Sequence, residues 1–252
     1  MEMEELIRQI TDSVVERLKN EQRPAMPERA APRMPERAAP GMPETGEGLR
    51  KVFDYTRMDA GLPLKEAEAA AGIAKAKGYR SVCLPQWLVA PIAAIPMGDT
   101  LLTTIVGLPG GRSMTQAKYA ETKIAIQNGA SGVAIPVNME LLANGIKEEA
   151  KLDLANAAVP AEGTGSLVIA LVELGDIPEE RAFDALAIAE SAGADEIRLS
   201  WILSGRPADR EFIARFIRRS GLPVSVVGGM SRESLAEVAA SGACGIGAGF
   251  EW

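Results

Sequence analysis

Five polar side chains lie at or near the ends of predicted β-strands, where they could take part in a reaction. They are Asp54, Arg57, Glu173, Arg198 and Ser200. The chain contains no histidine, which excludes Ser-His-Asp and Cys-His catalysis, a histidine general base and zinc or iron sites that need histidine ligands. Carboxylate, hydroxyl and guanidinium groups remain as candidates, and the sequence predicts neither a metal nor a cofactor.

Amine chemistry depends on where the lysines lie. A Schiff base needs a neutral amine, which lysine can supply once burial and a cationic neighbour lower its pKa. The last lysine is Lys151, ahead of the fifth predicted strand, and the strands that follow carry none. Five of the earlier lysines fall on predicted outer helices: Lys65, Lys75, Lys77, Lys118 and Lys123. The sequence therefore predicts no replacement Schiff-base lysine.

Composition excludes several other classes of function. The chain has 27 Lys and Arg against 34 Asp and Glu, a net charge of -7, so nucleic-acid binding is not expected. No run of 18 apolar residues is present, and we expect no membrane span. The N-terminus is charged from Glu2 onward and lacks an apolar signal core, and the two cysteines, Cys83 and Cys244, cannot form a disulfide framework. These features predict a reducing, cytoplasmic location.

The elements that would position these groups are predicted between residues 49 and 252. Short β-rich runs alternate there with Ala-rich helical stretches over about 204 residues, close to the lower limit of a (β/α)8 TIM barrel. The strands are predicted at 51–54, 81–84, 101–106, 132–137, 167–173, 196–199, 223–227 and 245–248. Helices are predicted at 64–77, 115–128, 178–191, 209–219 and 232–241. An open doubly wound sheet is the alternative.

Glycines follow the ends of the predicted helices and lead into the next strand. They are Gly78, Gly129, Gly193, Gly221 and Gly242. A glycine directly after a helix commonly takes the left-handed conformation that ends it. We expect each of the five to do so.

Two further segments precede the barrel. Residues 21–48 repeat the sequence MPERAAP at 26–32 and 34–40 and begin a third copy at Met42. Frequent proline favours extended polyproline II, so this segment is predicted to be a semi-rigid spacer. Residues 1–20 are predicted to form an amphipathic helix, whose apolar stripe needs a partner. The stripe includes Leu6, Ile7, Ile10, Val14 and Leu18.

The barrel region resembles the deoxyribose-phosphate aldolases from about residue 50 to 250. The block TTIVGLPGG at 103–111 is the most specific match, and SVCLP at 81–85, KYAETKIAIQNGA at 118–130 and DYT at 54–56 follow in the same order. Glu173 matches a strand-five glutamate, and Gly228 and Gly229 match a strand-seven glycine pair. The resemblance implies reversible cleavage of deoxyribose 5-phosphate into glyceraldehyde 3-phosphate and acetaldehyde, through a Schiff base on a strand-six lysine.

Three positions depart from the pattern that the resemblance implies. Arg198 stands at the Schiff-base lysine, Ser225 at the companion lysine of strand seven, and Ala134 at the strand-four aspartate. The serines of the terminal phosphate-binding loop align with Gly249 and Phe250. A guanidinium stays protonated and its lone pairs are delocalised, so Arg198 cannot form a Schiff base.

Each substituted or unusual residue has competing interpretations. Arg198 either pairs with Glu173 in the barrel mouth or binds an anionic ligand together with Ser200 and the backbone amides of the glycines at 228, 229, 247 and 249. Trp87 and Trp201 follow strands two and six, and either plug the core or rim of the mouth or stack on a ligand. Cys83 is predicted to be a small buried core residue, and Thr103 and Thr104 to pack within their strand.

The N-terminal stripe resembles the encapsulation peptides of bacterial microcompartment cargo enzymes, which are amphipathic helices on a Pro/Ala-rich tether. This resemblance implies docking of residues 1–20 on a shell protein or on another cargo copy, and a location in a microcompartment lumen. The alternatives are that the helix caps its own barrel or mediates oligomerisation.

Two hypotheses for function follow. In the first, the protein is a microcompartment-associated aldolase-like barrel without Schiff-base chemistry, acting as a noncatalytic or ligand-binding component. In the second, it is an active lyase or isomerase on a sugar phosphate or small aldehyde, with repurposed residues. A homodimer is compatible with both.

Overall fold

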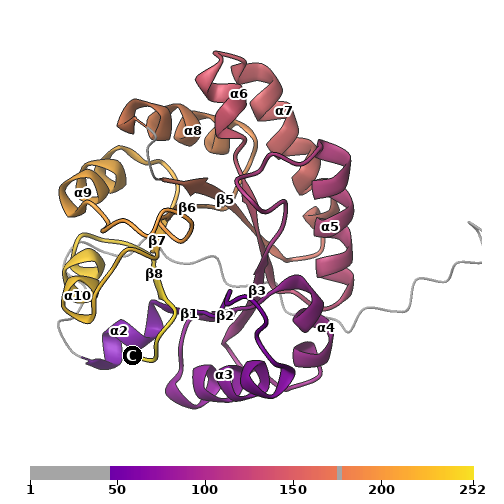
Figure 1. Cartoon of the computed structure of the whole chain (residues 1–252), viewed down its shortest axis with the longest axis vertical. Coiled ribbons are helices and arrows are strands. Elements are labelled where there is room, and N and C mark those ends of the chain that lie inside the picture. The colour runs from indigo at the N-terminus through magenta and orange to yellow at the C-terminus, as the bar shows by residue number, and fades with distance from the viewer. Residues whose placement is uncertain (1–45, 175–177) are drawn as a thin grey trace, which may run out of the picture. The chain divides into compact units, whose positions relative to one another are not determined.

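A computed structural model describes residues 46–174 and 178–252 and shows a closed barrel of parallel strands (Figure 1). The strands follow one another in chain order, and β1 closes the barrel by pairing with β8. The strand bounds are β1 Phe53–Thr56, β2 Ser81–Cys83, β3 Leu101–Ile105, β4 Gly132–Pro136, β5 Leu167–Glu173, β6 Glu196–Ser200, β7 Val224–Val227 and β8 Gly245–Ala248. The predicted (β/α)8 barrel is confirmed. The predicted amphipathic helix at 1–20 and most of the predicted spacer lie outside the described residues.

Helices cover the outside of the barrel and join successive strands (Figure 1). Their bounds are α2 Gly46–Lys51, α3 Leu64–Lys77, α4 Gln86–Ala93, α5 Thr115–Gln127, α6 Met139–Ala143, α7 Lys147–Ala158, the 3-10 helix η1 Val159–Ala161, α8 Glu179–Ser191, α9 Arg210–Arg219 and α10 Arg232–Ala240. Within the described residues no helix combines the length and the apolar character that crossing a bilayer would require.

The start of the barrel differs from the prediction. A strand was expected at 51–54, but Lys51 ends helix α2, and β1 begins at Phe53. Helix α4 is also absent from the prediction, because it has no charged residue to mark an outer face and contains Pro91. Helical periodicity read from polar and apolar positions could not detect such a segment.

Four of the five helix-ending glycines take the expected left-handed conformation. Gly78, Gly129, Gly193 and Gly242 have φ angles between 67° and 104°. The expectation for Gly221 is wrong, because it is not among the residues with positive φ. Its amide instead donates to Glu190 Oε1 at 2.8 Å, so a side-chain contact with helix α8 shapes this turn.

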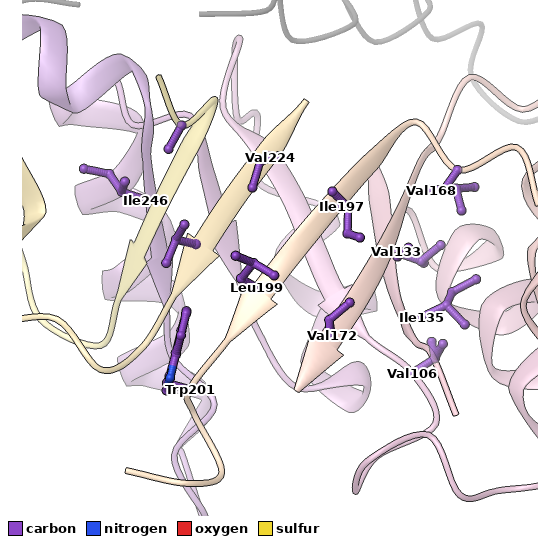
Figure 2. Close-up of a cluster of buried hydrophobic side chains, with 14 of the residues drawn as sticks. Val106, Val133, Ile135, Val168, Val172, Ile197, Leu199, Trp201, Val224 and Ile246 are labelled. Carbon is purple, nitrogen blue, oxygen red and sulfur yellow. The ribbon is translucent and has the colours of Figure 1, made fainter. Parts of the chain in front are cut away.

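The larger core lies between the strands and the surrounding helices. Alternate residues of each strand point outward into it, and Figure 2 shows Val133 and Ile135 of β4 with Ile197 and Leu199 of β6. All four are fully buried. The intervening residues of the same strands must therefore face the inside of the barrel.

The barrel interior holds a smaller apolar cluster of its own. It consists of Cys83, Ile105, Ala134, Leu167, Ile169 and Leu171, with Met58 and Leu101 packed against it. Cys83 is fully buried, and Thr103 and Thr104 are buried in β3, as predicted. Strands β6, β7 and β1 contribute buried polar side chains to another part of the interior.

Candidate functional site

Strand β6 places three polar side chains on the inside of the barrel. Glu196, Arg198 and Ser200 alternate with Ile197 and Leu199. The latter two belong to the larger core between the strands and the helices. All three polar side chains are buried, and Arg198 is among the largest fully buried side chains of the described residues. A charged group so far from water must be paired, because desolvation of an isolated ion costs several kcal/mol.

The partners of Arg198 come from three strands. Its Nη2 lies 2.9 Å from Asp54 Oδ2 on β1 and 3.3 Å from Glu196 Oε1, two residues away on β6. Its Nε donates to Ser225 Oγ on β7 at 2.9 Å. The guanidinium is therefore fixed by two carboxylates and a hydroxyl.

A second arginine completes this group. Arg80, directly before β2, donates from Nη1 to Asp54 Oδ2 at 2.7 Å and from Nη2 to Glu196 Oε2. Its side chain is 8% exposed. Two carboxylates thus share two guanidinium groups, and the formal charge of the set is zero. We call Asp54, Arg80, Glu196 and Arg198 the ionic cluster.

Two serines fill the remaining acceptor positions of the ionic cluster. Ser81 Oγ donates to Asp54 Oδ1 at 2.6 Å, and Ser225 Oγ donates to Glu196 Oε1. The space for the cluster comes from β8, because a Cβ atom on Gly245 would lie 2.7 Å from Asp54 Oδ2. Every carboxylate oxygen of the cluster accepts a hydrogen bond, which is the condition under which buried charges are tolerated.

The electrostatics keep the ionic cluster charged. Burial alone would raise the pKa of Glu196, but Arg80 and Arg198 outweigh burial and hold that pKa below its ordinary value. Burial would likewise lower the pKa of Arg198, but Asp54 and Glu196 raise it above its ordinary value. The cluster therefore contains no neutral nitrogen with a free lone pair.

The predicted pairing of Arg198 with Glu173 is wrong. Glu173 ends β5, and its Oε1 accepts a hydrogen bond from the Leu203 amide at 2.8 Å in the loop after β6. Burial raises the pKa of Glu173 above its ordinary value, although Ser200 and the loop amides oppose the shift. The prediction failed because Asp54 and Glu196 are nearer partners, and barrel closure brings Asp54 to β6 from far away in the sequence.

The predicted ligand-binding glycines are engaged in the fold. The Gly228 amide donates to Gly247 O at 3.0 Å, and Gly229 O accepts from the Ala208 amide at 2.8 Å. A Cβ atom on Gly229 would lie 2.6 Å from Arg206 O, so the loop after β6 packs directly on this glycine pair. Gly249 follows the end of β8 near Thr56 O. The described contacts of Arg198 include none of these glycines.

Lys118 lies on α5, as predicted, but it is not on the outer face. It is the only buried lysine among the described residues, and it is fully inaccessible. Its Nζ lies 2.5 Å from Asp153 Oδ2 on α7. This amine is therefore paired with a carboxylate of helix α7.

The two tryptophans at the rim have different environments. Trp201 is 6% exposed and belongs to the outer core (Figure 2), so its assignment to the core is confirmed. Trp87 is 62% exposed in the first turn of α4, so the prediction that it plugs the mouth is wrong. Arg57, another residue near a strand end, pairs with Asp59 at 2.6 Å and Glu66 at 3.1 Å.

Sequence reasoning missed two members of the ionic cluster, Arg80 and Glu196. Glu196 carries a usable signal, since it lies two residues before Arg198 and two strand residues share a face. Arg80 carries no such signal, because it lies directly before β2 and a charged residue at that position is usually exposed. Among the described residues no group of three or more His, Cys, Asp and Glu side chains is arranged to hold a metal.

Solved structures with this fold include aldolases. The chain matches an aldolase named QR15 with a TM-score of 0.74 and 22% identity, over 80% of this chain and 91% of that one. A deoxyribose phosphate aldolase from Aeropyrum pernix, described as tetrameric, also gives 0.74, at 19% identity over 82% and 89%. These likenesses define the class of the fold, a (β/α)8 barrel of the kind that aldolases use.

Sequence comparison then gives the family. The deoxyribose-phosphate aldolase of Bacillus cereus (strain AH820) is 30% identical over 204 residues, which is 79% of this chain and 91% of the relative. The enzyme of Bacillus anthracis matches to the same extent. No family model matches the chain. The chain belongs to the deoxyribose-phosphate aldolase family.

Proposed function

We propose that this protein is a member of the aldolase family that has lost Schiff-base chemistry and acts as a noncatalytic or ligand-binding component. The observation that carries the proposal is the environment of Arg198. A nucleophilic amine must be neutral and must face the substrate, whereas the Arg198 guanidinium is held by Asp54 and Glu196 inside the barrel.

The other two substituted positions support the same conclusion. Ser225 accepts from Arg198 Nε and donates to Glu196, so it serves the ionic cluster. Ala134 lies in the apolar cluster and offers no group for proton transfer. None of the three positions supplies an amine or a base.

The decisive experiment is borohydride trapping. The full-length protein is incubated with acetaldehyde and sodium borohydride, and the intact mass is measured. Borohydride also fixes acetaldehyde on exposed lysine amines, so we expect adducts at exposed lysines and none inside the barrel. An adduct that maps to a side chain inside the barrel would overturn the proposal.

Arg198→Lys provides the matched variant. A lysine at this position faces Asp54 and Glu196, and carboxylates within about 4–6 Å favour the protonated amine. It also lacks a cationic neighbour at Ser225. We expect this variant to remain without aldolase activity, which a coupled assay of deoxyribose 5-phosphate cleavage measures. Cleavage at the rate of an active family member would show that residue 198 alone controls activity.

An active lyase or isomerase is the second candidate, and Glu173 favours it. This carboxyl group lies at the mouth beside Ser200, and burial raises its pKa, as a general acid or base requires. A phosphorylated sugar or small aldehyde would be the substrate. Thermal-shift screening with sugar phosphates, followed by product analysis, tests this candidate, and turnover abolished in Glu173→Gln would favour it.

We also propose that residues 1–20 direct the protein to a bacterial microcompartment. The support is the apolar stripe in the sequence, its acidic and basic opposite face, and the proline-rich tether that follows. We expect Leu6→Glu with Ile10→Glu and Val14→Glu to abolish co-purification with shells, while substitutions at the opposite-face residues Glu5 and Asp12 do not. Retention of shell binding in the stripe variant would exclude this role.

A further inference from the structure

Glu196 contacts three polar neighbours in the barrel interior. Its Oε1 accepts hydrogen bonds from Arg198 Nη2 at 3.3 Å and from Ser225 Oγ, and its Oε2 accepts one from Arg80 Nη2. The side chain is fully buried, so water screens its charge only weakly. Any basic group at position 198 therefore lies beside a poorly screened carboxylate.

The charges of the ionic cluster cancel only while Glu196 is ionised. Asp54 and Glu196 supply two negative charges, and Arg80 and Arg198 supply two positive ones. If position 196 carried no charge, one positive charge would remain in excess at a buried site, which is strongly disfavoured. An amine can remove such an excess by releasing its proton, whereas a guanidinium cannot.

Two thiols beside the ionic cluster add no charge to it. Cys83 on β2 interacts with Arg198, and Cys244, directly before β8, interacts with Glu196. Burial raises the pKa of both thiols above the ordinary value, so they remain protonated near neutral pH. The four members of the ionic cluster therefore set the charge balance in this part of the described structure.

We propose that Glu196 is a positioning residue that requires a cation at position 198 and so keeps a neutral amine out of the barrel interior. The inference rests on the proposed function and deepens it, because it assigns the absence of Schiff-base chemistry to a second residue besides Arg198. With Glu196 ionised, a basic side chain at position 198 keeps its proton and completes the neutral cluster. With position 196 uncharged, Arg80 balances Asp54, and an amine at position 198 becomes an excess cation that releases its proton.

The ionic cluster is covered on the side of the barrel mouth, which decides what the test must measure. Thr56 and Val227 lie two residues nearer the mouth than Asp54 and Ser225, and both are buried. A Cβ atom on Gly247 would lie 2.7 Å from Val227 Cγ2 and 3.1 Å from Thr56 Oγ1, so these side chains fill the interior above the cluster. The test therefore measures protonation at position 198 directly and does not depend on a substrate entering the barrel.

Carbon-13 NMR of the full-length chain with labelled lysine follows the amine introduced by Arg198→Lys, whose signal is absent from the wild-type spectrum. In this variant we expect the amine to stay protonated, with a pKa above its ordinary value, because Asp54 and Glu196 both remain. Adding Glu196→Gln should lower the amine pKa below its ordinary value. The ratio of neutral to protonated amine at a given pH should rise at least about 100-fold between the two variants.

Two further double variants separate charge balance from other causes. Glu173→Gln with Arg198→Lys makes the same change at the end of β5, where Glu173 binds the Leu203 amide, and should leave the amine pKa unchanged. Asp54→Asn with Arg198→Lys removes the other acid and, by the same count of charges, should lower the amine pKa to a similar degree. The proposal is wrong if Glu196→Gln leaves the amine pKa unchanged, or if only Asp54→Asn lowers it.

Circular dichroism confirms that each variant is folded, and Glu196→Ser with Arg198→Lys replaces the glutamine variant if that one unfolds. The outcome is separate from that of the proposed function. An acetaldehyde adduct inside the wild-type barrel contradicts the proposed function alone. An amine at position 198 that stays protonated without the Glu196 charge contradicts this inference alone.

Discussion

The barrel interior has two sides of opposite character. Strands β6, β7 and β1, with Arg80 before β2, contribute the ionic cluster and the serines bound to it. Strands β3, β4 and β5 contribute an apolar cluster around Ala134, Ile169 and Leu171. The two sides meet between β5 and β6, where Ile169 is the register partner of Glu196 and Leu171 that of Arg198.

This difference shows that the two sides of the barrel are stabilised in different ways. On one side the Arg198 guanidinium is neutralised by Asp54 and Glu196, and Ser225 is hydrogen-bonded to Arg198 and Glu196. On the other side Ala134 packs among apolar side chains. On the ionic side every buried charge has a partner of opposite sign. The apolar cluster contains no charged residue and needs no such partner.

Removing one charge from the ionic side should have the largest effect. Arg198→Met leaves Asp54 and Glu196 with Arg80 as their remaining cation, and breaking a buried ion pair on one side costs about 3–5 kcal/mol. Urea unfolding followed by circular dichroism measures the loss in the free energy of unfolding. Ile169→Val, in register with Glu196, is the control on the apolar side and should cost about 0.5–1.5 kcal/mol. Equal losses would contradict the distinction between the two sides.

Introducing a charge on the apolar side should have an intermediate effect. Ala134→Asp places a carboxylate where the family resemblance implies one, but the neighbouring side chains Ile105, Ile169 and Leu171 offer it no hydrogen-bond donor. Burial of the neutral carboxyl group costs about 1–3 kcal/mol without a hydrogen-bond partner, and burial of the charged form costs more. We therefore expect a larger loss near neutral pH than in acid, where the carboxyl group is neutral. Ala134→Asn has a similar size without a charge and should show no such pH dependence. If both variants respond alike to pH, size rather than charge determines the cost.

The smallest effect is expected at the mouth, where the two sides meet solvent. Burial raises the pKa of Glu173 in the folded protein, so the folded state binds a proton more readily than the unfolded state. Stability therefore declines as pH rises from the unfolded pKa, about 4.3 for Glu, through the raised folded pKa. Glu173→Gln, which keeps an acceptor for the Leu203 amide, should flatten this decline and change stability near neutral pH by less than about 1 kcal/mol. Urea unfolding at several pH values measures it, and an unchanged profile would mean that Glu173 does not titrate in this range.

Much of the fold could be predicted from local patterns. All eight strands were located, and β5 Leu167–Glu173 and α3 Leu64–Lys77 agree with their predicted bounds. Helices without a regular alternation of polar and apolar residues could not be predicted, and α4 is an example. The turn at Gly221 was misjudged because its conformation depends on Glu190, which lies on another helix.

The candidate site was predictable only in part. The types of residue at 134, 198 and 225 follow from alignment along the chain, and they suffice to predict that no strand lysine is available. The partner of Arg198 was misassigned, because Glu173 and Asp54 are equally plausible acids until the barrel is closed. Pairing of β1 with β8 then places Asp54 across from β6.

The sequence by itself determined the alternation of strands and helices, the absence of histidine and the presence of an arginine at position 198. These features are local, since each depends on residue type or on spacing within one element. Tertiary structure alone decided that Arg80 enters the barrel, that Lys118 is buried against Asp153 and that Trp87 remains exposed. Such contacts join residues far apart in the chain, and electrostatic pairing and burial act through distance in space rather than distance in sequence.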